Sequence, residues 1–181
     1  MSGRLLILSG PSGVGKDTVL DLWQARNPRV VRVVAHTTRA PRVGERDGLD
    51  YTFLDVPTFL DRADAGKYLE FKHVHGNYYG TPLDHLEQLL AADKVAVLKI
   101  DVQGAIEVME LRPDALTVML LPPSFEELER RIRARGTDSA EVIERRLVGA
   151  RAELDEAPRY QHQLVNHEVE DVLAALDELI G

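Results

Sequence analysis

A glycine-rich stretch near the start of the chain has the spacing of a phosphate-binding loop. It follows the apolar run Leu5–Leu8 and reads GPSGVGKDT. Glycines at this spacing let successive backbone N–H groups curl around phosphate oxygens at a helix N-terminus, and the lysine adds a positive charge. We therefore expect a nucleotide phosphate site formed by Gly10, Pro11, Ser12, Gly13, Val14, Gly15, Lys16, Asp17 and Thr18.

Asp17 stands where this motif usually has Ser or Thr, whose hydroxyl reaches a bound Mg²⁺. A carboxylate at this position leaves two alternatives. Either Asp17 contributes to the Mg²⁺ shell, or Thr18 supplies the hydroxyl while Asp17 only faces solvent. We favour a metal-related role for Asp17.

Two further segments carry groups that suit an anionic ligand. Arg39 and Arg42 lie three residues apart across a proline turn, so both planar guanidinium groups can meet one phosphate. The alternative is a solvated basic turn. Glu70 and the segment 75–82, which reads HGNYYGTP, add a carboxylate, two phenols and a hydroxyl. A Tyr-Tyr pair on its own is more often packing than ligand binding.

Charged residues at element ends complete the set of candidates. Asp101 follows an apolar strand, where it can bind Mg²⁺ directly or through water; the alternative is that it caps the next helix. Arg131 and Arg135 lie four residues apart on one helix face, and Arg146 follows the polar hinge 133–138. This pattern suits a mobile lid, although arginines on helices are often only solvated.

Apolar runs of strand length alternate with helical patterns. The expected strands are 5–8, 30–35, 95–100, 117–121 and 162–165; the expected helices are about 15–26, 84–92, 103–110, 124–134, 139–156 and 169–179. Ser124 and Glu127 have the spacing of a capping box. The alternation predicts an α/β fold with a parallel sheet covered on both faces and ligands at the C-terminal ends of its strands.

Residues 36–82 break this alternation. They are rich in Thr, Arg, Gly, Asp and Tyr, with strand-like pieces at 51–54 and 68–75 around a short helix at about 56–65. Because binding residues concentrate in such irregular segments, we interpret this stretch as an insertion that carries part of the site.

Composition limits the possible partners. At 181 residues the chain is expected to form one domain, and a net charge of −8 disfavours a general nucleic-acid or anionic-membrane surface. The sequence has no cysteine, which excludes disulfides and thiolate metal sites. It shows no apolar run long enough for a signal peptide or a membrane span. We expect a cytoplasmic protein with small-molecule ligands.

Together these motifs resemble one family over essentially the whole chain, the guanylate kinases. The matching pieces occur in the family's order: GPSGVGK, HTTRAPRVGERDGLDY, YLEF, HGNYYGTPL, IDVQGA, LPPS, ELERRIRARGTDS and a late VN at 165–166. The resemblance implies a P-loop kinase fold in a single domain, 1–181, with a central parallel five-stranded sheet flanked by helices. It also implies a core (1–35, 83–124 and 157–181), a GMP-binding insertion (36–82) and a helical lid (about 125–156).

The implied reaction is phosphoryl transfer from ATP to GMP, and to dGMP, with Mg²⁺ as cofactor and ADP released. Carried over by position, the residues implied to bind GMP are Arg39, Arg42, Tyr51, Glu70, Tyr79, Thr81 and Asp101, with Glu70 and Thr81 reading guanine. The residues implied to act on the transferred phosphoryl group are Lys16, Arg135, Arg146 and, in support, Arg131. Asn166 is implied to lie near the adenine, and Asp17 and Asp101 are the metal candidates.

The chain departs from the family pattern at three positions. Besides Asp17, Ala35 replaces a serine that touches the GMP phosphate in many members, and Lys99 stands where an acidic residue is common. Ribose 1,5-bisphosphate phosphokinases also read GKD in this loop, so they are one alternative. A second alternative is a guanylate-kinase-like scaffold domain, but such domains generally lack an intact phosphate loop, which this chain retains.

Overall fold

The computed structural model describes residues 3–74, 76–134, 136 and 139–181. Its main sheet has five strands in the order β2-β7-β1-β8-β9, and every neighbouring pair is parallel. The strands are β1 (Arg4–Ser9), β2 (Val30–Arg32), β7 (Val95–Lys99), β8 (Leu116–Leu121) and β9 (His162–Val165). The predicted parallel five-stranded sheet is confirmed.

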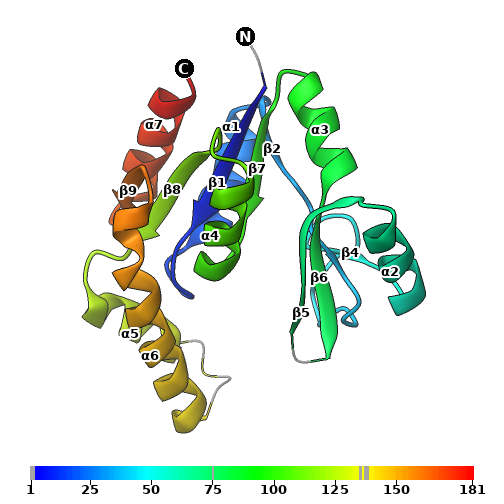
Figure 1. The fold of residues 1–181 in the computed structure, drawn as a ribbon. Helices are drawn as coiled ribbons and strands as arrows, with labels where there is room; N and C mark the ends of the chain where they lie inside the picture. Colours follow the sequence, from blue (N-terminus) through cyan, green and yellow to red (C-terminus); the bar gives the residue numbers. More distant parts are fainter. Residues whose placement is uncertain (1–2, 75, 135, 137–138) are drawn as a thin grey trace.

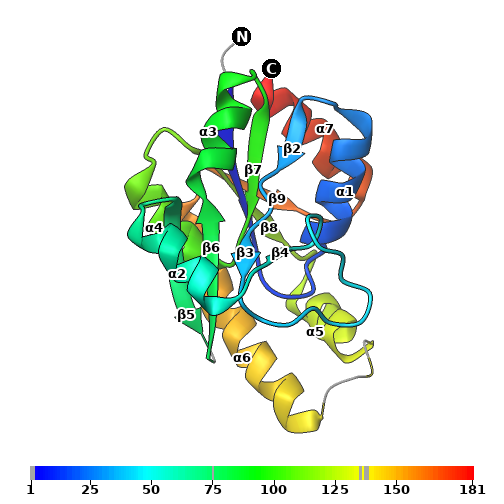
Figure 2. The same cartoon turned by 90° about the vertical axis from the view of Figure 1, so that its right-hand side faces the viewer.

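Helices cover both faces of this sheet (Figure 2). On one face lie α1 (Lys16–Arg26) and α7 (Val169–Ile180), and on the other lie α3 (Leu83–Ala91) and α4 (Val102–Leu111). Because successive side chains of a strand point to opposite faces, Leu6 and Leu8 of β1 pack with α1 and α7, while Leu5 and Ile7 pack on the other side. This two-sided core fixes the strand ends that carry the phosphate loop.

The strand β2 is shorter than the sequence predicts. It ends at Arg32, whereas the apolar pattern runs to Ala35. Val33 still donates its backbone N–H to Val97 of β7, but the carbonyl of Ala35 accepts from Thr52. The chain therefore leaves the main sheet here to enter a second one, which is why the hydrophobic run outlasts the strand.

The residues between 36 and 82 form that second, four-stranded sheet, in the order β4-β3-β6-β5. Its elements are β3 (His36–Thr37), β4 (Thr52–Phe53), α2 (Val56–Asp64), β5 (Tyr68–Val74) and β6 (Asn77–Pro82). Phe59 of α2 is fully buried and stacks on the ring of Tyr68, with centroids 4.5 Å apart. The sequence predicts the helix and the strand-like pieces, but not their union in one sheet.

Two further helices, α5 (Phe125–Ala134) and α6 (Ala140–Asp155), pack on each other around Leu128, Ile132 and Leu147; the short helix η1 (Ala157–Arg159) follows. At the start of α5, Ser124 Oγ accepts the backbone N–H of Glu127, as a capping box requires, while the Glu127 carboxylate accepts from Arg130 and Arg131. Every predicted helix agrees with the structure to within one residue at each end.

The second sheet and the α5–α6 pair both extend beyond the C-terminal ends of the main strands, on opposite sides of the phosphate loop (Figure 1). The start of β1 and the end of α7 lie at the other end of the sheet (Figure 1). Across the described residues, no helix combines the length and apolar character needed to span a membrane.

Candidate active site

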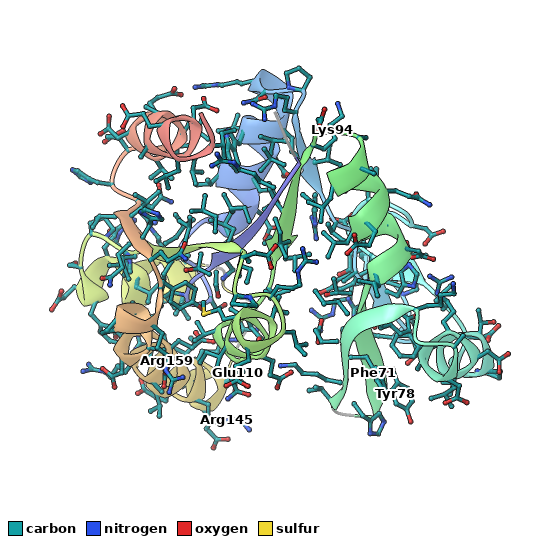
Figure 3. The ribbon with its side chains drawn as sticks, turned by 45° about the horizontal axis from the view of Figure 1, so that its top comes forward. Phe71, Tyr78, Lys94, Glu110, Arg145 and Arg159 are labelled. Atoms are coloured by element: carbon teal, nitrogen blue, oxygen red, sulfur yellow. The ribbon has the colours of Figure 1, made fainter. Side chains whose placement is uncertain are left out.

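A cavity of about 430 Å³ opens at the C-terminal ends of the main strands. It is lined by the phosphate loop, by β2 and the second sheet, by the end of β7, and by α6. The β5–β6 hairpin, which carries Phe71 and Tyr78, and α6, which carries Arg145, are separate elements in Figure 3. The charged lining residues are Lys16, Arg32, Glu70, Lys72, Lys99, Asp101 and Glu153.

The phosphate loop depends on glycine at positions 10, 13 and 15, whose φ angles are 146°, 86° and 103°. Side chains are strained in this region, and close neighbours leave no room for a Cβ atom at two of the three. A Cβ on Gly10 would lie 2.6 Å from the Leu120 carbonyl oxygen, and one on Gly15 would lie 2.7 Å from Asn166 Nδ2. The loop can therefore hold its backbone N–H groups toward a ligand only with this sequence.

Replacing Gly15 by alanine should lower the free energy of unfolding by about 2 kcal/mol and the melting temperature by about 4–8 °C. The reason is the positive φ together with the 2.7 Å approach to Asn166. Affinity for ATP should fall as well, because the loop must shift. Gly149→Ala is the matched control: that glycine lies in α6 with no atom within 4 Å of an added Cβ. Equal melting temperatures for the two variants would contradict the prediction.

Lys16 begins α1 and is held in the loop. Its Nζ donates to the carbonyl oxygens of Gly10 and Pro11, the latter at 3.1 Å. Burial is the main reason that the pKa of Lys16 falls from 10.5 to about 8; Glu153 opposes the shift and Lys99 adds to it. Among the described residues, the hydrogen bonds of this partly buried ammonium group go to carbonyl oxygens, so it is well suited to receive an anion.

Two side chains donate hydrogen bonds to the backbone of the phosphate loop. Asn166, which is 4% exposed, donates through Nδ2 to the Val14 carbonyl at 2.8 Å. Arg131 donates to the same carbonyl at 3.5 Å and to Glu127 at 2.8 Å. The structure thus places Asn166 and Arg131 against the phosphate loop, where both would influence bound phosphates through the backbone they support.

Glu70 and Thr81 form one unit on the opposite wall. They face each other across β5 and β6, and Thr81 Oγ1 donates to Glu70 Oε1 at 2.7 Å. Burial raises the pKa of the Glu70 carboxyl above its ordinary value, while the hydrogen bond from Thr81 opposes this shift. A half-buried carboxylate with one oxygen engaged offers the other to a ligand with N–H donors.

Ligand binding to Glu70 should depend on pH. A guanine ring can donate only to the ionised carboxylate, so affinity should fall as pH drops through the raised pKa of Glu70. Guanosine is the better probe, because a phosphate group itself titrates near about pH 6. Calorimetric titrations between pH 8 and pH 4 would measure the effect. Guanosine affinity that begins to fall only below 4.5, the ordinary Glu value, would contradict it.

Arg39, Tyr51 and Tyr79 form a second cluster. The Arg39 guanidinium lies 5.4 Å from the Tyr51 ring centroid, and the rings of Tyr51 and Tyr79 are 6.1 Å apart. Arg39 is bound through two nitrogens to Glu45, at 2.8 and 3.0 Å, and this pairing is the main cause that lowers the pKa of Glu45 to about 2. Both tyrosines line the cavity.

Arg42 is placed differently. Its side chain is exposed and does not line the cavity, although its backbone N–H donates to the Glu45 carboxylate at 2.7 Å. The sequence predicts that Arg39 and Arg42 both face one anion. In the structure Glu45 bridges the two residues instead, so a bound phosphate would have to draw Arg42 inward.

The two metal candidates differ in their relation to the cavity, because Asp101 is among its lining residues and Asp17 is not. Asp101 lines the cavity and caps α4, because its Oδ1 accepts the Gly104 backbone N–H at 2.6 Å. Asp17, with a side chain 70% exposed, accepts from Lys99 and lies 4.0 Å from Arg32 Nη1. The described residues contain no group of three or more acidic or histidine side chains able to hold a metal alone.

The remaining predicted arginines belong to α5 and α6. Arg135 lies outside the described residues. Arg146 is half-buried on α6, two turns before Glu153, which lines the cavity. Residues seven apart share a helix face, so Arg146 lies on the cavity side of α6.

Four charged lining residues had no role in the sequence interpretation: Arg32, Lys72, Lys99 and Glu153. Burial raises the pKa of the Glu153 carboxyl, while Lys16 and the backbone of Ser12, in the phosphate loop, oppose the shift. The sequence offers a signal for two of these residues. Arg32 is the one charged residue in the apolar run 30–35, and Lys99 is a charged residue at the end of an apolar strand. The sequence offers no signal for Glu153, because its helix carries many charged residues that are expected to face solvent.

Comparison with known proteins points to one family. The guanylate kinase family model matches residues 2–181. The chain is 47% identical to a guanylate kinase of Aromatoleum aromaticum, covering all of this chain and 87% of that protein, and 48% identical to one of Gloeobacter violaceus, covering 98% and 86%. A crystal structure of guanylate kinase from Anaplasma phagocytophilum is similar with a TM-score of 0.75 at 33% identity, covering 99% of this chain and 85% of that one.

Proposed function

This chain belongs to the guanylate kinase family, and we propose from that premise that its cavity binds GMP against the second sheet and ATP phosphates against the loop. The protein is an ATP-dependent enzyme that phosphorylates GMP to GDP. One observation supports the binding arrangement most strongly: the Glu70–Thr81 pair and Lys16 line the same cavity from opposite walls. We also infer that dGMP is accepted and that the protein is cytoplasmic, where these nucleotides are available.

Glu70 and Thr81 would select guanine. The N1–H and 2-amino group of guanine can both donate to a carboxylate, whereas adenine lacks both of these donors. Leaving a buried carboxylate without donors is unfavourable by about 1–3 kcal/mol or more, so AMP should bind poorly. Arg39, Arg42, Tyr51 and Tyr79 would bind the GMP phosphate; Ala35, which lines the cavity, removes one hydroxyl from that set.

Phosphoryl transfer then requires that the two substrates are positioned and that the negative charge of their phosphates is neutralised, more than it requires a general base. The attacking group is a phosphate oxygen that is already anionic, so no side chain has to remove a proton. Lys16 and the loop N–H groups would hold the ATP phosphates, and Arg131, Arg135 and Arg146 would add positive charge from the α5–α6 side. We propose that 36–82 is the GMP-binding insertion and about 125–156 the lid, attached to a core formed by the remaining residues.

The residues present suit Mg²⁺. This ion is commonly bound through one or two carboxylates together with substrate phosphates. Asp101 and Asp17 both lie close enough to Lys16 to raise its pKa, so two carboxylates are present near the phosphate loop. We propose that both contribute, Asp17 through the carboxylate oxygen that Lys99 leaves free. When bound, Mg²⁺ would neutralise phosphate charge and orient the groups that react.

Removing the metal should abolish the reaction, and a chelator assay would establish this. Asp17→Ala should then raise the Mg²⁺ concentration needed for half-maximal rate by about 10-fold, whereas Asp17→Ser, with a hydroxyl, should raise it less. Unchanged Mg²⁺ dependence in both variants would remove Asp17 from the metal shell.

A panel of acceptors tests the proposed site. ATP-dependent ADP release should be rapid with GMP and dGMP and slow with AMP and ribose 1,5-bisphosphate. Equal rates with AMP would overturn the role of Glu70. A preference for ribose 1,5-bisphosphate would instead favour the related phosphokinase activity, which the GKD sequence at Asp17 left as an alternative.

A further inference from the structure

Lys99 occupies a central position in the cavity and has no role in the mechanism above. It is the last residue of β7 and pairs in register with Leu8 of β1, two residues before the phosphate loop begins. Its side chain is only 17% exposed and lines the cavity.

The partners of Lys99 leave most of its ammonium group available. Its Nζ donates to Asp17 Oδ1, and Arg32 Nη1 lies 4.0 Å from the same oxygen. The three residues form a cluster with one excess positive charge, beside the positive charge of Lys16. An ammonium group has three donors, so one N–H on Asp17 leaves two for another acceptor.

The sheet order indicates which ligand lies nearest. The strand β7 stands between β1, which leads into the phosphate loop, and β2, which leads into the second sheet. On the β2 side, Arg32 Nη2 donates to the Asp50 carbonyl at 3.0 Å, next to Tyr51. Lys16 and the phosphate loop would bind the phosphates of ATP, the phosphoryl donor. Lys99 therefore lies in the cavity between them and Tyr51 and Tyr79, which would bind the phosphate of the acceptor GMP.

We propose that Lys99 binds the phosphate of the acceptor nucleotide and that Asp17 is the residue that positions its ammonium group. This inference rests on the proposed function of the cavity. A nucleoside monophosphate carries nearly two negative charges at neutral pH, which makes it a stronger partner for an ammonium than one exposed carboxylate. Two donors of Lys99 would meet the phosphate, and the third would remain on Asp17.

The test is calorimetric titration of the metal-free protein with GMP and with guanosine, which lacks the phosphate. Lys99→Met should weaken GMP binding by about 10- to 100-fold and leave guanosine binding unchanged, and Lys99→Arg should restore most of the loss. Lys94→Met is the matched control, because Lys94 precedes β7 at its opposite end (Figure 3). Unchanged GMP affinity in Lys99→Met, or equal losses for GMP and guanosine, would overturn the proposal.

The role of Asp17 is tested by a double-mutant cycle. Asp17→Ala should lower GMP affinity when Lys99 is present and should not lower it in the Lys99→Met background, because coupled residues give non-additive effects. An increase of similar size in both backgrounds would show that Asp17 acts only as a nearby negative charge, and would overturn its positioning role. Failure of the unsubstituted protein to bind GMP would refute the proposed function itself, which is a different outcome from unchanged binding in Lys99→Met.

Discussion

Replacing Lys16 by methionine should lower kcat for phosphoryl transfer by about 10³-fold. The ammonium group lies within the phosphate loop, where its direct partners are the carbonyl oxygens of Gly10 and Pro11. Negative charge develops and moves between phosphate oxygens during transfer, and a neutral thioether cannot compensate for it. The low pKa of Lys16, about 8, results mainly from burial, so the folded protein should tolerate an uncharged side chain of similar length.

The measurement is the steady-state rate of ADP release at saturating ATP and GMP. Lys94→Met controls for loss of one lysine charge, since the Lys94 ammonium group is exposed and donates to the Pro28 carbonyl, away from the cavity. GMP affinity of Lys16→Met should stay close to that of the unsubstituted protein, because the acceptor wall is intact. A kcat within 10-fold of the original would mean that the loop backbone alone binds the transferred group.

Replacing Glu70 by glutamine should lower kcat/KM for GMP by about 30-fold or more, equivalent to about 2 kcal/mol. The amide accepts hydrogen bonds less strongly than a carboxylate, and its NH₂ group would face the donors of guanine. Thr81 loses its charged acceptor as well. The rate with AMP should change little, so the preference for GMP over AMP should shrink by the same factor.

Glu107→Gln provides the control for this variant. Glu107 lies in α4, is half-exposed and pairs with Lys72 at 3.5 Å, but it does not line the cavity. The Glu107→Gln substitution removes one carboxylate charge from the same region without changing Glu70 or Thr81, the pair that would bind guanine. If Glu107→Gln lost as much GMP activity as Glu70→Gln, the loss would reflect the electrostatic field and not recognition.

The main sheet and its helices could be predicted because local patterns determine them. Apolar runs such as 95–100 have the length of buried strands, and Ser124 marks a helix start that the structure retains. The strand β2 could not be bounded in this way. Its apolar run continues to Ala35, and only the long-range contact with Thr52 ends the strand.

Site residues were predictable where a motif fixes the backbone. The glycines of the phosphate loop have the positive φ angles that their spacing indicates, and Glu70 and Thr81 meet because a hairpin brings them into register. Ion pairs between distant elements were not predictable. The contact of Asp17 with Lys99 joins residues 82 positions apart. The pair of Arg39 and Glu45 is local, but the sequence interpretation assigned Arg39 to an anionic ligand and gave Glu45 no role.

The most direct test of the proposed site is a crystal structure of the protein with GMP bound. We expect the N1–H and amino group of guanine within hydrogen-bond distance of Glu70, and the phosphate among Arg39, Tyr51 and Tyr79, with Lys99 approaching it. GMP bound with its phosphate in the loop against Lys16 and its base away from Glu70 would contradict this account.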